Sequence, residues 1–395
     1  MRNLAHAPTY RQDLFSRNGI RDPYPHYARL RELGPVVWLS RQRVYALPRY
    51  AECKAALRDD ATYVSGQGVA LNPLTNRMSR GTTLNSDGAD HQRRRKLLAH
   101  RLTPKALRSM GEAIDAKAQS VVEAAIARRH VDGVRDVAMA LPLAVVPDLV
   151  GWPEDGRENL MTWAGATFDS LGPLNRQWLR TTPAALSMLR FSRRVVRDRS
   201  VLSGSMGDDV LRAADDGALP RSECSALMID YLAPSLDTTI SAISSALHLF
   251  ATHPDQWQAL RDDPSLVANA VNEVVRLESP LRAFSRKSVI DSHIGGVDLP
   301  RGSRVLVVYA SANRDEREWD DPDVFDITRD ANRHLGFGYG THGCAGQGLA
   351  RLESQAILRE LAARVERINL VGPPTWAVNN IIHRYDQLPL ELVPA

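Results

Sequence analysis

The sequence predicts a mainly α-helical protein with small β-sheets at one edge, built as a single domain over residues 1–395. Three observations predict this class. Helical periodicity dominates from about residue 90 to 277. Short strands and turns replace it between 286 and 308. No repeat, Gly/Ser linker or low-complexity tract marks a domain boundary, although a chain of this length has room for two or three ordinary domains.

The expected elements run from short strands through long helices to a second set of strands. Thr103-Pro104 and Trp152-Pro153 interrupt the helical region as helix starts or breakers. Strands are also expected at the C-terminus. The other predicted ranges are, in chain order, strands over 35–39 and 44–47, a helix over 50–58, a long apolar helix over 225–251, a glycine-rich loop over 336–348 and a helix over 349–365.

Composition excludes several classes of protein. Charged residues make up 24% and hydrophobic residues 44% of the chain, which is typical of globular proteins and not of disordered or fibrous ones. A net charge of +4 does not indicate a nucleic-acid binder. The N-terminus lacks a signal-peptide pattern, and the most apolar stretch, 138–152, is too short to span a membrane. We therefore expect a cytoplasmic protein that does not enter the membrane.

Three cysteines, Cys53, Cys224 and Cys344, are too few and too scattered for a disulfide framework or a zinc site. Cys344 lies in the glycine-rich loop just before a predicted helix, where amide N–H groups are expected to lower its thiol pKa. A glycine-rich turn around a buried cysteine is the simplest alternative. A nucleotide-phosphate loop is excluded, because the loop has no Walker lysine and no GxGxxG follows an early strand.

The run Phe337-Gly-Tyr-Gly-Thr-His-Gly-Cys-Ala-Gly346 resembles the heme-binding signature of cytochromes P450, F-G-x-G-x-H-x-C-x-G, at every fixed position. The resemblance implies the P450 fold, a triangular helical prism that holds heme b between a long central helix and the cysteine-loop helix. It implies that Cys344 is the thiolate ligand of the heme iron and that Phe337, His342 and Gly346 contact the heme. Thiolate ligation favours O–O cleavage, so O₂ is the expected co-substrate.

A second set of residues resembles the family's bracing network. Glu273-Val-Val-Arg276 places a carboxylate and a guanidinium three residues apart on one helix face, which read alone is an ordinary surface pair. The resemblance implies instead the buried E-x-x-R pair that supports the heme loop. It also implies that Arg329 is the third member of this network, with a structural role.

Four residues resemble the contacts of the heme propionates. His91 and Arg95 match the family's H-x-x-x-R helix, and Arg286 and His342 match the other usual contacts. The remaining basic residues of this run, Arg93, Arg94 and Lys96, are expected to be solvated.

The long helix over 225–251 contains Asp237-Thr238, which resembles the acid–alcohol pair of the family's central helix. The resemblance implies that these two catalytic residues deliver protons during O₂ activation. Pro234-Ser235 departs from the usual Ala-Gly just before this pair, and proline costs roughly 3 kcal/mol in a regular helix. Peroxide-using relatives also carry proline here but lack the pair, so we expect an O₂-dependent enzyme.

The chain has no flavin or nicotinamide motif and no cysteine cluster for iron–sulfur. The resemblance therefore implies a separate acidic ferredoxin, reduced by a ferredoxin reductase from NAD(P)H, and a monomeric enzyme. A basic patch would attract such a donor, although merely solvated arginines are an equal alternative. The patch consists of Arg93, Arg94, Lys96, Arg101, Lys105 and Arg108.

Among family members, the chain is most similar to bacterial enzymes that oxidise para-substituted benzoates. Gln67 stands where those enzymes hold the substrate carboxylate with arginine, and a neutral amide does not replace that contact. Asp230 would also repel an anion. We therefore expect a hydrophobic aromatic substrate that is neutral or nitrogen-containing, such as a natural-product intermediate. The predicted pocket residues are Gln67, Val69, Phe168, Leu171, Asp230, Ala233, Pro234, Ala283, Phe284 and Ile381.

Three functions are consistent with these sequence features. The first is a heme-thiolate monooxygenase that performs hydroxylation or O-demethylation. The second is oxidative C–C or C–N coupling without oxygen insertion, for example of tryptophan-containing cyclodipeptides. The third, a heme-based sensor or binding protein, is disfavoured by Asp237 and Thr238, since a binder needs no proton relay.

Overall fold

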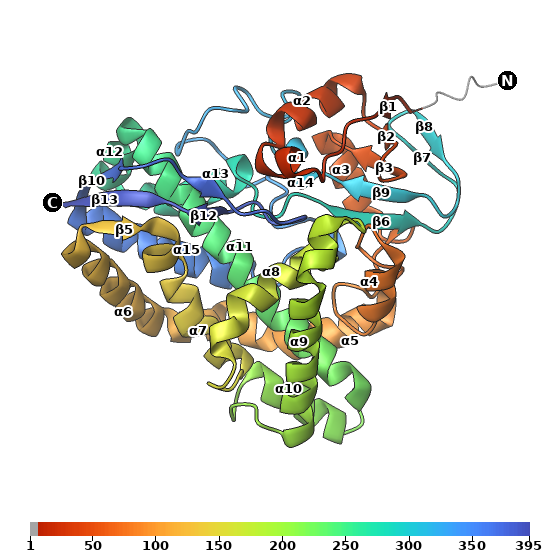
Figure 1. Cartoon of the computed structure of the whole chain (residues 1–395), viewed down its shortest axis with the longest axis horizontal. Helices are drawn as coiled ribbons and strands as arrows, with labels where there is room; N and C mark the ends of the chain where they lie inside the picture. The colour runs from red at the N-terminus through yellow and green to blue at the C-terminus, as the bar shows by residue number, and fades with distance from the viewer. Residues whose placement is uncertain (1–6) are drawn as a thin grey trace.

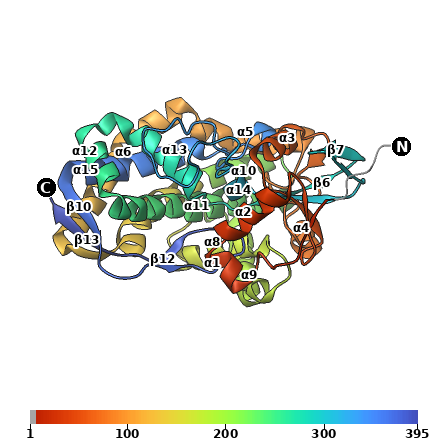
Figure 2. The same ribbon diagram turned by 90° about the horizontal axis from the view of Figure 1, so that it is seen from above.

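The computed structural model describes residues 7–395 and is organised around one long helix, α11 (Cys224–Thr252). This helix runs through the middle of the molecule and is buried along most of its length (Figures 1 and 2). It extends the predicted range by one residue at each end. Such a helix carries apolar residues on nearly every side because other helices surround it.

Helices from both halves of the chain pack around α11, and α7, α8, α9, α13 and α15 all contact it. Helix α6 lies against α15. The bounds of these helices and their neighbours are α5 (Gly88–Ala99), α6 (Pro104–Arg128), α7 (Ala140–Val150), α8 (Leu160–Ser170), α9 (Arg176–Asp198), α10 (Met206–Asp215), α12 (Pro254–Asp262), α13 (Val267–Leu277) and α15 (Gln347–Arg364).

The two predicted breakers are helix boundaries. The hydroxyl of Thr103 accepts a hydrogen bond from the amide of Ala106, with Pro104 in the first turn, so this pair starts α6. At the other site α7 ends at Gly151, whose φ of 89° is the left-handed conformation that glycine favours.

A six-stranded sheet, ordered β1-β2-β3-β9-β6-β4, forms the right-hand end of the molecule in Figure 1. Strand β6 pairs antiparallel with β9, with Phe284 opposite Val307, and so places Phe284 beside the helical region. The elements here are β1 (Thr9–Tyr10), α1 (Arg17–Arg21), α2 (Tyr24–Leu33), β2 (Val37–Leu39), β3 (Val44–Leu47), α3 (Tyr50–Arg58), β4 (Tyr63–Val64), α4 (Pro73–Met78), β6 (Phe284–Ser288), β9 (Arg304–Val307) and α14 (Tyr309–Ala312).

Three smaller sheets complete the fold, ordered β10-β13-β5, β11-β12 and β7-β8. The first closes the opposite end of the molecule (Figure 1). Their strands are β5 (His130–Asp132), β7 (Ser292–Ile294), β8 (Val297–Leu299), β10 (Val365–Leu370), β11 (Thr375–Trp376), β12 (Tyr385–Gln387) and β13 (Pro389–Pro394). None of the helices within residues 7–395 has the length and apolarity that a membrane span requires.

Candidate functional site

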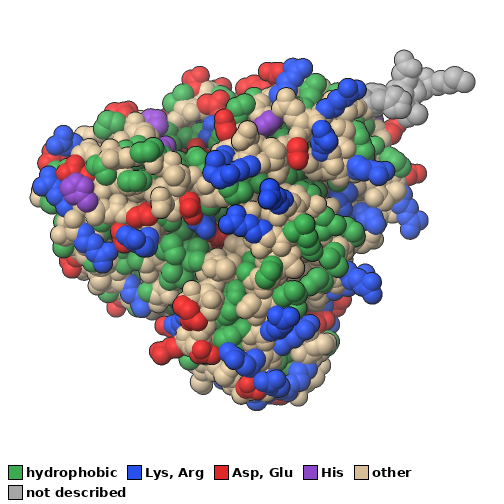
Figure 3. Space-filling view, viewed as in Figure 1, with side chains coloured by type: hydrophobic (Ala, Val, Ile, Leu, Met, Phe, Trp, Pro, Cys, Tyr) green, Lys and Arg blue, Asp and Glu red, His purple; other side chains and the backbone are tan. Residues whose placement is uncertain are grey.

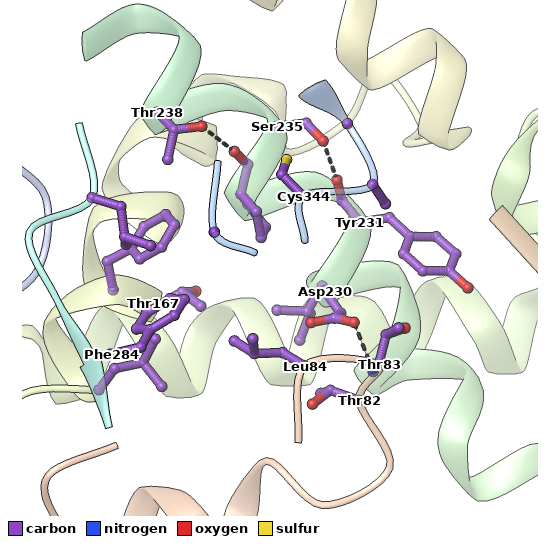
Figure 4. Close-up of a pocket in the computed structure, with 18 of the residues that line it drawn as sticks. Thr82, Thr83, Leu84, Thr167, Asp230, Tyr231, Ser235, Thr238, Phe284 and Cys344 are labelled. Carbon is purple, nitrogen blue, oxygen red and sulfur yellow. Dashed lines mark hydrogen bonds between the residues drawn. The ribbon is translucent and has the colours of Figure 1, made fainter. Parts of the chain in front are cut away.

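A cavity of about 570 Å³ lies between α11 and the cysteine loop. Its walls come from the segment between α4 and α5, from α8, α9 and α11, from β6, and from residues 336–350 (Figure 4). Six segments, several of them far apart in the sequence, therefore enclose one space. The walls are mostly apolar, which is typical of a site for a small hydrophobic molecule.

The cysteine loop is shaped by close backbone contacts. The N–H of Cys344 donates to the carbonyl of Phe337 at 2.8 Å, and Cys344, Phe337 and Gly346 all line the cavity. Gly340 has a φ of 69°, and a Cβ at this position would lie 2.7 Å from the carbonyl oxygen of Leu57. Only glycine fits there, so the loop packs closely beneath the cavity.

The pKa of Cys344 differs from the sequence prediction. Burial raises the pKa of this thiol, and the amides of Gly346 and Gln347 oppose the shift only in part. The prediction of a lowered pKa was wrong for the thiol by itself, because the loop buries the sulfur as well as directing amides at it. Within residues 7–395, no cluster of three or more His, Cys, Asp or Glu side chains is placed to hold a metal ion.

Four basic side chains line the cavity together: His91, Arg95, Arg286 and His342. The rings of His91 and His342 lie 4.2 Å apart between centroids. The Nδ1 of His91 is 3.2 Å from the carbonyl oxygen of Thr83, and its Nε2 is buried without a hydrogen-bond partner in the described chain. The Nε2 of His342 lies 3.5 Å from a carboxylate oxygen of Asp87. Buried polar atoms normally have partners, so the two arginines and the open nitrogen of His91 fit the two propionates of a heme.

The bracing residues form one buried network. Arg276 donates to both carboxylate oxygens of Glu273 at 2.6 and 2.7 Å, and neither side chain is exposed. Arg276 also donates to the carbonyl oxygens of Asn313 and Pro322 at 2.9 and 2.7 Å. Arg329 approaches Glu273 to 3.2 Å. The network thus ties α13 to the chain that leads into the cysteine loop.

Asp237 and Thr238 point to different sides of α11. Thr238 lines the cavity, and its hydroxyl donates to the carbonyl of Pro234 at 2.6 Å (Figure 4). Asp237 is fully buried on the far side, where its carboxylate lies 2.7 Å from Nε of Arg384. Burial raises the pKa of Asp237, and Arg384 opposes that shift. Arg384 lies 147 residues away along the chain, so no local pattern predicts it as the partner of Asp237.

A second buried acid lies on α8 near Asp237. Asp169 accepts hydrogen bonds from the amide of Asn380 at 2.7 Å and from the side chain of Gln177 at 2.9 Å. Burial raises the pKa of Asp169 to about 7, and the charge of Asp237 adds to the shift. Because α8 packs against α11, two buried carboxyl groups, those of Asp237 and Asp169, lie on the side of α11 that faces away from the cavity.

Half of the predicted pocket residues line the cavity: Phe168, Leu171, Asp230, Pro234 and Phe284. The other half do not, and the prediction is corrected for them. The side chain of Gln67 is exposed, and its backbone carbonyl accepts from Arg304 at 3.2 Å. Four residues are buried in the cores behind the cavity wall, namely Val69, Ala233, Ala283 and Ile381.

Asp230 faces the cavity from α11 (Figure 4). Its Oδ2 accepts a hydrogen bond from the backbone N–H of Thr83 at 2.8 Å. Burial raises the pKa of Asp230 to about 6, and hydrogen bonds from Thr83 and Leu84 limit the shift. Thr82, Thr83 and Thr167 also line the cavity and were missed, because nothing in their local sequence distinguishes them from other loop and helix threonines.

The mouth of the cavity lies between α4 and α9. The indole N–H of Trp178 on α9 donates to the hydroxyl of Thr75 on α4 at 3.3 Å. Leu74 and Met78 on α4 are 45% and 54% exposed, and Leu179 on α9 is 67% exposed. Hydrophobic side chains gather over the upper end of α9, with basic ones below them (Figure 3). The rim is therefore apolar.

The predicted basic patch is smaller than expected. Arg94 is buried and donates to both carboxylate oxygens of Glu223 at 2.9 and 2.7 Å, so the prediction that it is solvated was wrong. Arg93 pairs with Asp90 at 3.2 Å, and Arg101 with Asp209 at 2.8 Å. The exposed residues that form none of these pairs are Lys96, Lys105 and Arg108. Lys105 and Arg108 are close in sequence on α6 to Leu107, which a Cβ on Gly348 of α15 would touch at 2.6 Å.

Comparisons with known proteins agree with this geometry. The family model described as Cytochrome P450 matches residues 192–364. The chain is 36% identical to cytochrome P450 CYP199A2 of Rhodopseudomonas palustris, with 97% of this chain and 94% of the relative covered. It is 32% identical to the beta-dihydromenaquinone-9 omega-hydroxylase of Mycobacterium tuberculosis, with 94% and 76% covered. The solved structure of P450BioI with an acyl carrier protein is similar at a TM-score of 0.86 and 26% identity, with 95% and 99% covered.

Proposed function

The chain belongs to the cytochrome P450 family of heme b-dependent, O₂-using oxidoreductases, and we propose that it oxidises a hydrophobic aromatic substrate by hydroxylation or O-demethylation. One observation carries the proposal: a single apolar cavity brings Cys344, the four basic side chains and Thr238 together. The substrate is of small to medium size and is neutral or nitrogen-containing.

The chain's own residues account for cofactor binding. Cys344 would ligate the iron, and His91, Arg95, Arg286 and His342 would meet the propionates. When bound, the heme supplies the oxidising chemistry, which reduction of O₂ at a thiolate-ligated iron makes possible. Glu273, Arg276 and Arg329 fix the loop that presents Cys344.

Proton supply is assigned to the two sides of α11. The Thr238 hydroxyl, held by the Pro234 carbonyl, offers a donor and acceptor inside the cavity. Asp237 is the buried acid behind it, and its ion pair with Arg384, whose own side chain is 17% exposed, orients the carboxyl. We assign Asp237 the role of relaying protons to Thr238 from the side of α11 that faces away from the cavity.

The lining of the cavity supports the substrate class. Phe168 and Phe284 offer flat aromatic contacts, Leu171 offers an aliphatic one, and threonines offer a few polar ones. The argument against benzoates no longer depends on Gln67, which is outside the cavity, but on Asp230, which is inside it. We assign the electron supply to a ferredoxin and its reductase, docking near Lys96, Lys105 and Arg108.

The test combines spectroscopy with product analysis. Cys344→Ala should abolish the thiolate-type absorption band of the reduced carbon monoxide complex, whereas Cys224→Ala, a matched change at a buried cysteine outside the cavity, should keep it. A band retained in Cys344→Ala would refute the ligand assignment. Turnover of para-methoxyphenol and a tryptophan cyclodipeptide under isotopically labelled O₂ should give a hydroxylated product that carries the label, or formaldehyde in step with the demethylated product. An unlabelled coupled product would count against oxygen insertion.

A further inference from the structure

Asp230 and Thr238 lie along the same face of α11 and border the same cavity. Among the side chains of residues 7–395 that line this space, Asp230 is the single carboxylate. Positions 230, 234 and 238 are four residues apart and so share one helix face. At 1.5 Å per residue, Asp230 and Thr238 are about 12 Å apart along the helix axis. Asp230 therefore lies about two helical turns from Thr238, the side chain to which we assign proton supply.

The charge of Asp230 has no fixed counter-ion. Arg94 lowers the pKa of this carboxyl, but its guanidinium is bound at both ends to Glu223, at 2.9 and 2.7 Å. Within residues 7–395 no basic side chain forms an ion pair with Asp230, whereas Asp237 on the other side of the helix has Arg384. The two acids of α11 thus differ in that one is paired within the protein and the other is not.

Neutral groups hold the carboxylate in place. The backbone N–H of Thr83 fixes Oδ2, and Thr82, Thr83 and Leu84 surround the acid (Figure 4). Because the pKa of Asp230 is about 6, the group is charged at neutral pH. An amide dipole orients such a charge but does not neutralise it, so the carboxylate keeps its attraction for a cation.

We propose that Asp230 is the specificity-determining residue for a substrate that carries an organic cation, such as a protonated amine, at the end of the cavity away from Thr238. This inference rests on the proposed function, since it names the substrate class of the same cavity. A bound cation would supply the missing counter-charge in surroundings of low dielectric constant, where the attraction is strong. An anion would meet repulsion there, and a neutral ligand would gain nothing from the charge.

The competing interpretation is that Asp230 only fastens the segment between α4 and α5 to α11. Asp230→Asn separates the two roles. Asparagine keeps an oxygen that accepts from the Thr83 N–H, so the segment stays fastened, but it removes the negative charge. Asp216→Asn, at an exposed position, is the matched control for the change in net charge.

The test uses the holoenzyme at about pH 7.5 and three ligands of one skeleton. They are (para-methoxyphenethyl)trimethylammonium, its tert-butyl isostere in which carbon replaces the charged nitrogen, and para-methoxyphenylpropanoate. A quaternary nitrogen has no lone pair, so it cannot coordinate iron and its binding reports on the cavity. Dissociation constants come from spin-state titration and, independently of the heme spectrum, from isothermal titration calorimetry.

We expect the wild type and Asp216→Asn to bind the ammonium ligand roughly tenfold or more tightly than the tert-butyl isostere, and the carboxylate most weakly. In Asp230→Asn the ratio should fall to about one, with the affinity for the isostere unchanged. Equal affinities in the wild type, a preference that survives Asp230→Asn, or loss of all binding in that variant would each overturn the inference. The reduced carbon monoxide spectrum of Asp230→Asn tests the proposed function separately.

Discussion

On the cysteine side of the cavity, charged groups satisfy one another: Glu273 and Arg276 are both fully buried, and Arg276 reaches several carbonyl oxygens as well. On the α11 side, Asp230 is held by a backbone amide and has no ion pair within the described chain. The bracing network of the cysteine loop is therefore complete without any ligand, whereas Asp230 leaves a charge for a ligand to meet. The contrast shows that a buried charge paired within the protein supports structure, whereas a buried charge left unpaired is available for binding.

Breaking the cysteine-side network should have the largest effect. Arg276→Met leaves the buried Glu273 with Arg329 alone, at 3.2 Å, in place of the two-bonded Arg276 pair. The loss should lower the free energy of unfolding by about 3 kcal/mol and reduce heme retention. Urea unfolding of the purified holoprotein measures the first effect, and heme content per chain measures the second.

The control for this change is Arg359→Met, which removes one member of a half-exposed ion pair with Asp115. Such a pair contributes less than about 1 kcal/mol. If both variants lost the same stability, the idea that burial makes the first network strong would be untenable.

The paired acid of α11 should matter for rate and not for substrate binding. Asp237→Asn should lower kcat by roughly a hundredfold, as is typical for removal of a proton-transferring group, while the melting temperature and ligand affinity stay close to wild type. The solvent isotope effect on kcat should rise, because proton delivery becomes limiting. An unchanged kcat would remove Asp237 from the mechanism.

The acid on α8 offers a test of how burial acts on a carboxyl group. The pKa of Asp169 in the folded protein is about 7, above the ordinary 3.8, so the folded state binds more protons than the unfolded state between these values. Wild-type stability should therefore fall as pH rises through this window and level off above it.

Asp169→Asn removes that dependence. Its free energy of unfolding should exceed the wild-type value by an amount that grows from about pH 4 to pH 7, reaching the order of 1–3 kcal/mol. Urea unfolding at several pH values measures the difference. A gap that is the same at every pH would mean that Asp169 is ionised throughout.

The smallest effect is expected at a residue that the sequence placed in the pocket. Gln67→Ala should change ligand affinity by less than about 0.5 kcal/mol, because the side chain is exposed outside the cavity. Phe284→Ala, which removes an apolar wall, should weaken binding about tenfold. Spin-state titrations of the two variants with one ligand compare them, and a large effect of Gln67→Ala would contradict the position of that loop.

The residues of the cofactor site were predictable because their spacing reflects a fixed chemical object. Cys344, His342 and Phe337 lie within one short loop, and His91 and Arg95 are one helical turn apart, so the local sequence carries the whole pattern. The central helix was also predictable, since a long apolar segment must be buried on all sides.

The substrate side was predictable only in part, because its partners are distant in sequence. Whether Gln67 points inward depends on Arg304, which holds the loop by its carbonyl groups. The basic run around Arg94 predicts a solvated side chain, but Arg94 pairs with Glu223, which is far along the chain. No periodicity or motif within a single segment contains these long-range contacts.

The mouth of the cavity influences how quickly ligands enter and leave. One side-chain hydrogen bond, from Trp178 to Thr75, joins its two edges. A bond of this kind contributes about 1 kcal/mol, which corresponds to a population ratio of only about five to one between joined and separated edges. The exposed apolar side chains beside it, Leu74, Met78 and Leu179, discriminate little between similar ligands. Many compounds should therefore enter and leave quickly. The residence time of a bound ligand should depend on its contacts with the side chains inside the cavity.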